Sequence, residues 1–349
     1  MEQVNPSEKF DINQIPEPEN ISEVIDQLMV NPNLTPLNYF NDFTEFAATS
    51  KELSGVDIDE SGIFDLDDGL KYMSMTIHAM HHHLENNPQK AAEILVSRAA
   101  RKMVCQGGIP RAITALLYHI NLGDPNGQYI ATGIKQGLEN AASVYGLTIS
   151  DKKIRFDYFG EHGSQAPTLI VNLAGTLPGT ELLRSKPMSQ SFKKKGNMIY
   201  LIGKVSEDIA TSDYLEFYHG IADSPLPAFD LEFEARLLQV VSSLIEKKLV
   251  ESAGPVAKGG IFFSLLRACW LNGLGFDITT AAETRTDAFL FGESMGRIIV
   301  GVSPEKEDDF VDFMYDSKVP FFTLGHVTKG EIRIDDQSFG FIDKMTESL

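Results

Sequence analysis

Apolar residues recur along this chain with two spacings, one typical of strands and one typical of helices, and the two alternate in an α/β order. In the first half, the pattern predicts strands at residues 71–77, 112–120, 154–159 and 168–173, and helices from Pro88 to Gly107-Gly108 and over residues 130–145. In the second half, it predicts strands at residues 198–202, 297–302, 321–327 and 331–334, and helices from Leu231, Gly260 and Pro304. Both halves are therefore α/β in character.

Residues at the expected helix ends support these assignments. Asn20 and Asp230 can each accept hydrogen bonds from the first backbone N–H groups of the helix that follows. Pro88 stands at a first helical position, where a missing N–H costs nothing. The first helix is short and its apolar face consists of Ile21, Val24, Ile25 and Leu28. The later helix after Asp230 has a longer face, made of Leu231, Ala235, Leu238, Val241, Ile245 and Leu249.

Three regions follow from composition along the chain. Residues 1–30 are an arm and a short helix, and the first 19 residues, polar and acidic with three prolines, are expected to be loose. Residues 31–183 form an N-terminal domain and residues 184–349 a C-terminal domain. A basic segment at residues 184–196, with glycine, serine and proline, is the expected junction.

Charge and cysteine content exclude several classes of protein. The 349 residues carry 30 basic and 49 acidic side chains, a formal net charge of −19, which disfavours binding to nucleic acid. Two cysteines, Cys105 and Cys269, lie in apolar helical patterns and are expected to be buried free thiols. The start of the chain has no secretory signal pattern, and the longest apolar run, residues 260–276, is too polar to span a bilayer. We therefore expect a cytoplasmic protein with no membrane contact.

Several short motifs occur in a fixed order, and together they carry a family resemblance. They are residues 99–110 (AARKMVCQGGIP) with Ala112-Ile113-Thr114, Asn121-Leu122-Gly123-Asp124-Pro125, Ser212-Asp213-Tyr214-Leu215 with His219-Gly220, Gly259-Gly260, and Leu290-Phe291-Gly292-Glu293-Ser294 with Arg297. In this order and spacing they resemble phosphoribosylformylglycinamidine synthase, the amide-forming ligase of purine biosynthesis. More narrowly, residues 25–340 resemble the second of its two synthetase halves, with no glutaminase domain attached.

The resemblance implies an aminoimidazole-ribonucleotide-synthetase-like architecture of α/β and α+β domains. An N-terminal α/β domain would pair its sheet with a second copy to make a barrel across a dimer, and a C-terminal α+β domain would pack against it. In the full-length enzyme the partner copy is the first half of the same chain. A homodimer or a separate synthase subunit is therefore the expected partner here.

The residues that bind Mg²⁺ in the family are replaced in this chain. Alignment to the family places His78 where an Asp is expected, and Arg98 and Lys102 where a Glu and an Asn stand one helical turn apart. Before the double glycine, the metal-binding Asp is Pro255 and the substrate-binding Ser is Ala257. Because lysine and arginine have no lone pair for a metal at neutral pH, Mg²⁺ is not expected to bind. The chain is thus expected to be a degenerate copy with no catalytic residue assigned.

The residues that remain suggest a metal-independent site for a phosphorylated ligand. Gly259-Gly260 opens a helix whose first N–H groups could hold an anion, with Lys258 beside them. If Arg98, Lys102 and His78 converge on Lys258, they would form a basic pocket for a small phosphorylated ligand, with ATP or ADP as the open candidates. The resemblance adds Asn121, Asp124 and Glu293 to the candidate ligand-binding residues.

Each feature also has a plainer interpretation. The glycine pair and Gly292-Glu293-Ser294 can be tight turns, residues 121–125 can be a turn by composition, and Arg98 with Lys102 can be a solvated helix face. The histidines 78, 81, 82 and 83, with Glu85, could instead hold zinc, but no third ligand is evident from spacing.

Three functions stay open: a non-catalytic relative that binds a nucleotide or phosphorylated ligand, an active ATP-dependent ligase subunit completed by a partner chain, and a ligand-free dimeric scaffold.

Overall fold

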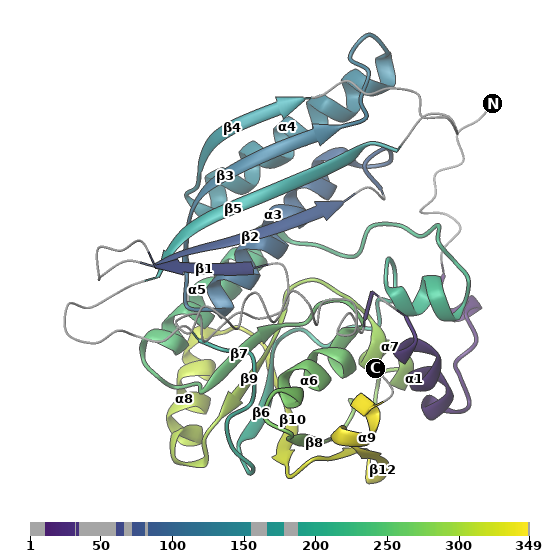
Figure 1. Cartoon of the computed structure of the whole chain (residues 1–349), viewed down its shortest axis with the longest axis vertical. Helices are drawn as coiled ribbons and strands as arrows, with labels where there is room; N and C mark the ends of the chain where they lie inside the picture. The colour runs from purple at the N-terminus through teal and green to yellow at the C-terminus, as the bar shows by residue number, and fades with distance from the viewer. Residues whose placement is uncertain are drawn as a thin grey trace. The chain divides into compact units, whose positions relative to one another are not determined.

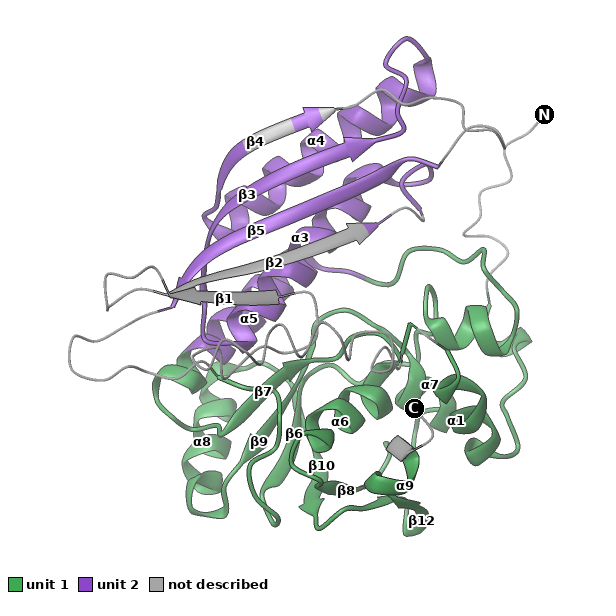
Figure 2. Ribbon diagram, in the orientation of Figure 1, with its two compact units in different colours: residues 1–50, 188–228, 243–349 green, residues 51–187, 229–242 purple. Residues whose placement is uncertain are grey.

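A computed structural model of the chain describes residues 11–31, 33–34, 61–65, 72–80, 83–154, 166–177 and 188–347. These form two compact units (Figure 2). Unit 1 contains residues 1–50, 188–228 and 243–349, and unit 2 contains residues 51–187 and 229–242. The division between the units falls within one helix, α5 (Leu231–Glu246). The predicted domain boundary at residues 183 and 184 lies outside the described residues and stays a prediction.

Unit 2 is built on a five-stranded sheet with helices on one face (Figure 1). Its strands, in spatial order, are β1 (Ser61–Asp65), β2 (Tyr72–Met80), β5 (Thr168–Leu177), β3 (Ile109–Tyr118) and β4 (Thr148–Ile154). Only β3 and β4 run parallel, and helix α4 (Pro125–Tyr145) connects them. Along β3 and β5, alternate residues are buried against α3 (Pro88–Cys105) and α4, and the residues between them are half-buried.

Helices α3 and α4 of unit 2 each begin directly after a residue that caps the helix. Asn87 Oδ1 accepts a hydrogen bond from the Lys90 N–H at the start of α3. Asp124 accepts one from the Gly127 N–H, so α4 begins at Pro125, five residues before the predicted start at residue 130. The sequence analysis considered residues 121–125 as a turn and as candidate ligand-binding residues, and did not use Asp-Pro as a helix-start signal. The helices cross closely at Gly137, where a Cβ would lie 2.2 Å from the Gln89 carbonyl oxygen.

Unit 1 is built on a seven-stranded sheet that is covered on both faces. Its strands, in spatial order, are β12 (Gln337–Phe341), β11 (Glu331–Ile334), β8 (Gly275–Ile278), β10 (Phe321–Thr328), β6 (Met198–Gly203), β9 (Arg297–Val302) and β7 (Ser252–Pro255). One face packs on helices α1 (Ile21–Met29), α6 (Gly260–Trp270) and α7 (Thr286–Phe291). On the other face, Tyr200 of β6 packs against Phe310 of α8 (Glu307–Ser317). The arrangement confirms the predicted mixed α/β architecture.

The remaining elements are short. They are η2 (Ile12–Gln14), a π-helical turn η4 (Tyr214–Tyr218), η5 (Pro304–Lys306) and α9 (Ile342–Glu347). Helix α5 is capped by Asp230 as predicted, but it ends at Glu246, so Leu249 lies beyond it and not on its apolar face. Lys248 has a φ of +57°, a left-handed conformation that no helix can continue through.

The strand predicted at residues 154–159 falls mostly outside the described residues, and β4 ends at Ile154.

The N-terminal segment is tied to unit 1 and is not loose over residues 11–19. Arg285 Nη1 donates hydrogen bonds to the carbonyl oxygens of Ile12 and Ile15, both at 2.8 Å. Glu17 Oε1 accepts one from the Thr286 N–H at the start of α7. Ile15 is buried in the core of unit 1. The expectation of a loose arm was wrong here because composition does not show that a distant arginine binds these carbonyls.

Two smaller expectations can also be compared with the structure. Cys105 and Cys269 are buried and neither is in a disulfide, as predicted, and burial raises the pKa of Cys269. Within the described part of the chain, no helix is both long enough and apolar enough to cross a membrane.

Candidate functional site

The loop before α6 has a conformation that glycine alone accepts readily. Gly259 and Gly260 have φ of +77° and +69°. A Cβ on Gly260 would lie 2.6 Å and 2.7 Å from the carbonyl oxygens of Leu290 and Gly292. The glycine pair therefore lets the chain pass against the end of α7 and turn into α6.

A buried carboxylate already lies at the N-terminal end of α6. Glu293 Oε1 accepts hydrogen bonds from two backbone N–H groups, those of Gly259 and Asp213, each at 2.9 Å. The positive end of a helix dipole favours a negative charge at this place. Glu293 is thus more than a turn residue: it joins the loop before α6 to the start of the π-helical turn η4. It also takes the Gly259 N–H, which sequence reasoning had assigned to an external anion.

An exposed lysine stands over a buried aspartate beside this carboxylate. Lys258 Nζ lies 3.7 Å from Asp213 Oδ2, and the side chains are 56% and 10% exposed. Among the described residues, none donates a hydrogen bond to Asp213 Oδ2. At 3.7 Å the two groups form an ion pair but not a hydrogen bond. A cation and an under-satisfied carboxylate oxygen therefore lie side by side at the N-terminus of α6.

The backbone that carries Asp213 is anchored by the next residue. Tyr214 is fully buried, and its hydroxyl donates to Asp287 Oδ2 at 2.7 Å and lies 2.9 Å from His219 Nε2. Arg285 binds both oxygens of Asp287, at 3.1 Å and 2.7 Å. Burial, then the hydrogen bond to Asp287, raises the pKa of Tyr214, and burial lowers the pKa of His219. Tyr214 therefore stays a neutral donor that fixes the start of η4.

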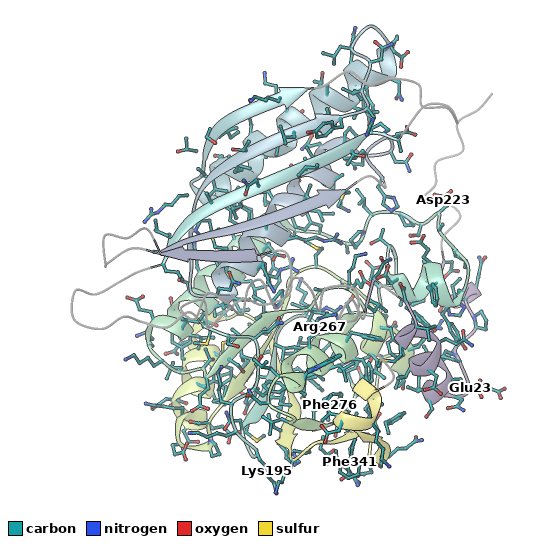
Figure 3. All side chains as sticks on the ribbon, viewed as in Figure 1. Glu23, Lys195, Asp223, Arg267, Phe276 and Phe341 are labelled. Carbon is teal, nitrogen blue, oxygen red and sulfur yellow. The ribbon has the colours of Figure 1, made fainter. Side chains whose placement is uncertain are left out.

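Arg267 lies in α6 and is labelled in Figure 3, and it forms hydrogen bonds with the loop that precedes this helix. Its Nη2 donates to the Lys258 carbonyl oxygen at 2.8 Å and to Ser264 Oγ at 3.3 Å. Ser264 Oγ in turn donates to the Gly260 carbonyl oxygen at 2.7 Å. These contacts hold the loop backbone, whereas the Lys258 side chain extends from it into solvent.

The other candidate residues belong to unit 2. Arg98 and Lys102 lie one turn apart on α3, as their spacing predicted. Arg98 is half-buried. Lys102 is only 5% exposed, so its side chain is not solvated. Asn121 Oδ1 accepts from the Gly123 N–H, and Asp124 caps α4. Both thus have local structural roles. The expectation that Arg98 and Lys102 form one pocket with Lys258 stays a prediction.

The histidine cluster is only partly within the described residues. His78 lies on β2 opposite Val171 of β5, and His83 has a φ of +64° in the turn that precedes α3. His81 and His82 lie outside the described residues. Over the described ranges, no group of three or more His, Cys, Asp or Glu side chains is placed to hold a metal ion.

Sequence reasoning missed the roles of Asp213, Tyr214, Arg285 and Asp287. Two of them stood in a quoted motif, Ser212-Asp213-Tyr214-Leu215, without an assigned role. Asp287 gave a usable signal, because it is a single carboxylate followed by the apolar run Ala288-Phe289-Leu290-Phe291. A charge in such a run needs a partner when it is buried.

Comparison with known proteins shows what this chain is similar to. Residues 194–336 match the family model described as the C-terminal domain of AIR synthase related proteins. Over 90% of its length, the chain is 28% identical to the phosphoribosylformylglycinamidine synthase subunit PurL of Moorella thermoacetica. The match covers 42% of that relative, so the chain spans less than half of its length.

Solved structures show the same fold. Thermotoga maritima PurL complexed with ATP superimposes with a TM-score of 0.64 at 17% identity, covering 82% of this chain and 46% of that one. The same protein complexed with FGAR gives a TM-score of 0.68 at 16% identity, covering 86% and 50%. The tt0281 protein of Thermus thermophilus gives 0.61 at 14% identity, covering 86% of this chain and 99% of that one. At these identities the likeness establishes the fold alone.

Proposed function

We propose that this chain, which is similar to AIR synthase-related proteins and to phosphoribosylformylglycinamidine synthase subunits, binds a nucleotide or another phosphorylated ligand without Mg²⁺. In this proposal it does not catalyse ligation by itself. The proposed site is the loop of residues 255–260 together with Asp213 and Glu293 (the α6 loop site). This function is related to purine biosynthesis through the family.

One observation carries the proposal: the side chain that the α6 loop site presents to solvent is an ammonium, Lys258. The two carboxylates nearby already have partners. Glu293 accepts from two backbone N–H groups, and Asp213 faces Lys258. Mg²⁺ needs several oxygen ligands, which this arrangement does not offer to it. An anionic group is therefore the ligand chemistry that fits the exposed end of the site.

Ligands with phosphate groups are also found on this fold. Thermotoga maritima PurL is known as a complex with ATP. A phosphate group would gain a charge-assisted hydrogen bond from Lys258, with the N-terminal end of the α6 dipole directed toward it. The adjacent Arg267 guanidinium adds positive potential to the loop backbone.

Replacing Lys258 with glutamate should lower the affinity for ADP, measured without Mg²⁺ by calorimetry, at least about tenfold, because a charge-assisted hydrogen bond is replaced by repulsion. Lys258→Gln tests the lost charge without repulsion. The control is Lys195→Glu, which makes the same change of charge on another exposed lysine of unit 1, labelled in Figure 3. Equal affinities in wild type and Lys258→Glu would rule out this site.

The alternative, an active ligase subunit, makes an opposite prediction about metal. Titration of ATP and ADP with and without Mg²⁺ separates the two, because a ligase requires the metal and a lysine-based site does not. Binding that appears only with Mg²⁺ would favour the ligase. No binding in either condition would favour a ligand-free scaffold.

We further propose that the partner of unit 2 is a second copy of the chain, bound through the sheet face that α3 and α4 leave open. On this face Leu116 and Ile170 lie opposite each other on β3 and β5 and are half-buried. Half-buried apolar side chains on a sheet face without covering helices favour coverage by another sheet. The match covers 99% of the tt0281 chain and 86% of this one, so the fold also occurs in a chain of similar length.

Replacing Ile170 with aspartate should convert the dimer to monomer in sedimentation or light scattering, because two charges would be buried at the symmetric interface. Gln136→Asp, on the exposed side of α4, adds the same charge as a control and should leave the dimer intact. A monomeric wild type would contradict the homodimer, and association only after adding a synthase subunit would favour the separate partner.

A further inference from the structure

We propose that residues 211–218 form a conformational switch that controls the α6 loop site. This segment, here called the strained turn, contains Asp213 and is held in place by Arg285 together with the N-terminal segment of residues 11–19. In the held state Asp213 pairs with Lys258 and so competes with any anion for that ammonium. The inference rests on the proposed function, because Lys258 is the group that would bind the anion, and it adds how that site is regulated.

The first argument is the backbone strain at the start of the turn. Thr211 has a φ of +59°, a left-handed conformation that is unfavourable for a residue branched at Cβ. Its Oγ1 is buried and makes no hydrogen bond with any described residue, so the side chain does not compensate for the strain. Residues 214–218 then form a π-helical turn, a rare conformation. The strained turn therefore needs contacts with the rest of unit 1 to keep this shape.

The second argument is that one guanidinium joins the strained turn to the N-terminal segment. The Tyr214 hydroxyl donates to Asp287 Oδ2 at 2.7 Å, and Asp287 is fully buried. Arg285 binds both oxygens of Asp287, at 3.1 Å and 2.7 Å. Its Nη1 also donates to the carbonyl oxygens of Ile12 and Ile15, both at 2.8 Å. Release of the N-terminal segment would thus loosen Arg285 and, through Asp287, Tyr214.

The N-terminal segment is the part of this arrangement that can move at low cost. Most of residues 11–19 are exposed, Ile12 is half-buried, and Ile15 is 9% exposed at the rim of the core. Segments with few buried apolar contacts open without global unfolding. Docked and released states of this segment can therefore exchange while the rest of unit 1 stays folded.

The third argument is what release would change at the site. Asp213 is 10% exposed and lies 3.7 Å from Lys258 Nζ, so it acts as an internal counter-ion. Its N–H shares Glu293 Oε1 with the Gly259 N–H. When the strained turn relaxes, Asp213 moves away from Lys258, while Glu293 still holds Gly259 and the loop. The ammonium is then available to an anion, so the held state is autoinhibited, and anion binding in turn favours release.

Amide hydrogen exchange on the full chain tests the switch without any ligand, because the Asp213 N–H is protected by its bond to Glu293. In Arg285→Met this N–H should exchange at least about tenfold faster, the effect of losing hydrogen bonds to a charged group. Adding Thr211→Gly to Arg285→Met should restore slow exchange, because glycine adopts the left-handed conformation without strain. Unchanged exchange in Arg285→Met, or no restoration by Thr211→Gly, would overturn the proposal.

Arg333→Met is the matched control for the loss of a guanidinium. Arg333 also pairs with two carboxylates of unit 1, those of Asp277 on β8 and Glu331 on β11. Its replacement should leave the exchange rate at Asp213 unchanged. Faster exchange there in Arg333→Met would mean that any lost arginine loosens unit 1, and the specific role of Arg285 would be overturned.

A second variant covers the case in which Arg285→Met does not fold. Ile15→Ala weakens the docking of the N-terminal segment and leaves Arg285 and Asp287 in place. Exchange at the Asp213 N–H should again be faster than in the wild type, because Arg285 loses two fixed acceptors. An unchanged rate in this variant would overturn the proposal.

Calorimetry with ADP in the absence of metal then measures the effect on the α6 loop site. Arg285→Met should bind ADP about two- to fivefold more tightly than the wild type, the effect of removing a partly exposed ion pair from Lys258. If exchange is faster but ADP affinity is not higher, autoinhibition is overturned. If ADP binds to neither protein, the proposed function fails and autoinhibition fails with it, whereas faster exchange would still support the switch itself.

Discussion

Replacing Glu234 with alanine should destabilise the protein by about 3–5 kcal/mol, the usual cost of removing one partner from a buried ion pair. Glu234 Oε1 lies 2.6 Å from Arg101 Nε within unit 2, and the two side chains are 1% and 3% exposed. Without the glutamate, the guanidinium would stay buried without this counter-ion. Chemical denaturation with urea measures the loss as a lower midpoint.

Two further variants separate the loss of the ion pair from a change in the stability of helix α5. Glu246→Ala removes an exposed glutamate near the end of the same helix, α5, and should change the free energy of unfolding by no more than about 0.5 kcal/mol. The double variant Arg101→Met with Glu234→Leu removes both charges, and it should recover most of the loss. Arg101→Met and Glu234→Leu are also measured singly. If the loss in the double variant equals the sum of these two losses, the charges are not coupled and the explanation is wrong.

Replacing Gly260 with alanine should cost about 2–4 kcal/mol, combining the left-handed backbone penalty with overpacking. The added Cβ would meet three backbone atoms of residues 290–292 at 2.6–2.7 Å, and backbone cannot turn aside as a flexible side chain can. Since the loop carries Lys258, the variant should also weaken ADP binding. Thermal unfolding and calorimetry on the same preparation measure both effects.

A second glycine of unit 1 isolates the two contributions. Gly196 has a φ of +87°, but a Cβ there would meet nothing within 4 Å. Gly196→Ala should therefore cost only the backbone penalty, about 1–2 kcal/mol, and leave ADP affinity unchanged. Equal destabilisation by the two substitutions would mean that the contacts of the added Cβ with residues 290–292 contribute nothing to the cost of Gly260→Ala.

Long periodic segments were the part of the fold that sequence reasoning predicted well. Helices α3 and α5 and strands β6 and β9 were predicted near their observed bounds, and α6 was predicted near its observed start, because capping residues and glycines mark these positions. The elements β7, β8 and α7 were missed. β7 consists of Ser, Ala, Gly and Pro, which are poor strand formers, and β8 has only two apolar residues. α7, with six residues, is too short to show a helical period. The start of α4 was placed late because its first turn, Pro125-Asn126-Gly127-Gln128, is polar and shows no apolar face.

The candidate site was predictable only in part, and the reason lies in contacts between distant residues. The Lys258-Gly259-Gly260 loop and its helix could be located from the chain itself. That Glu293 binds the Gly259 N–H and that Asp213 faces Lys258 depends on residues 34 and 45 positions away, which no local pattern reports. Sequence reasoning could name Glu293 as a candidate but not foresee that the protein supplies its own anion to the helix.

The hydrogen bonds of Arg285 to Ile12 and Ile15 have a consequence for biosynthesis. They join residues 273 and 270 positions apart, so Ile12 and Ile15 must wait for about 270 further residues to be synthesised before they can be fixed. At ordinary rates of synthesis that interval is about 15–60 s. During it, the apolar side chains of Ile12, Ile15 and α1 lack the core against which they finally pack. The acidic residues interspersed among them, Asp11, Glu17, Glu19 and Glu23, then help to keep the waiting segment from aggregating.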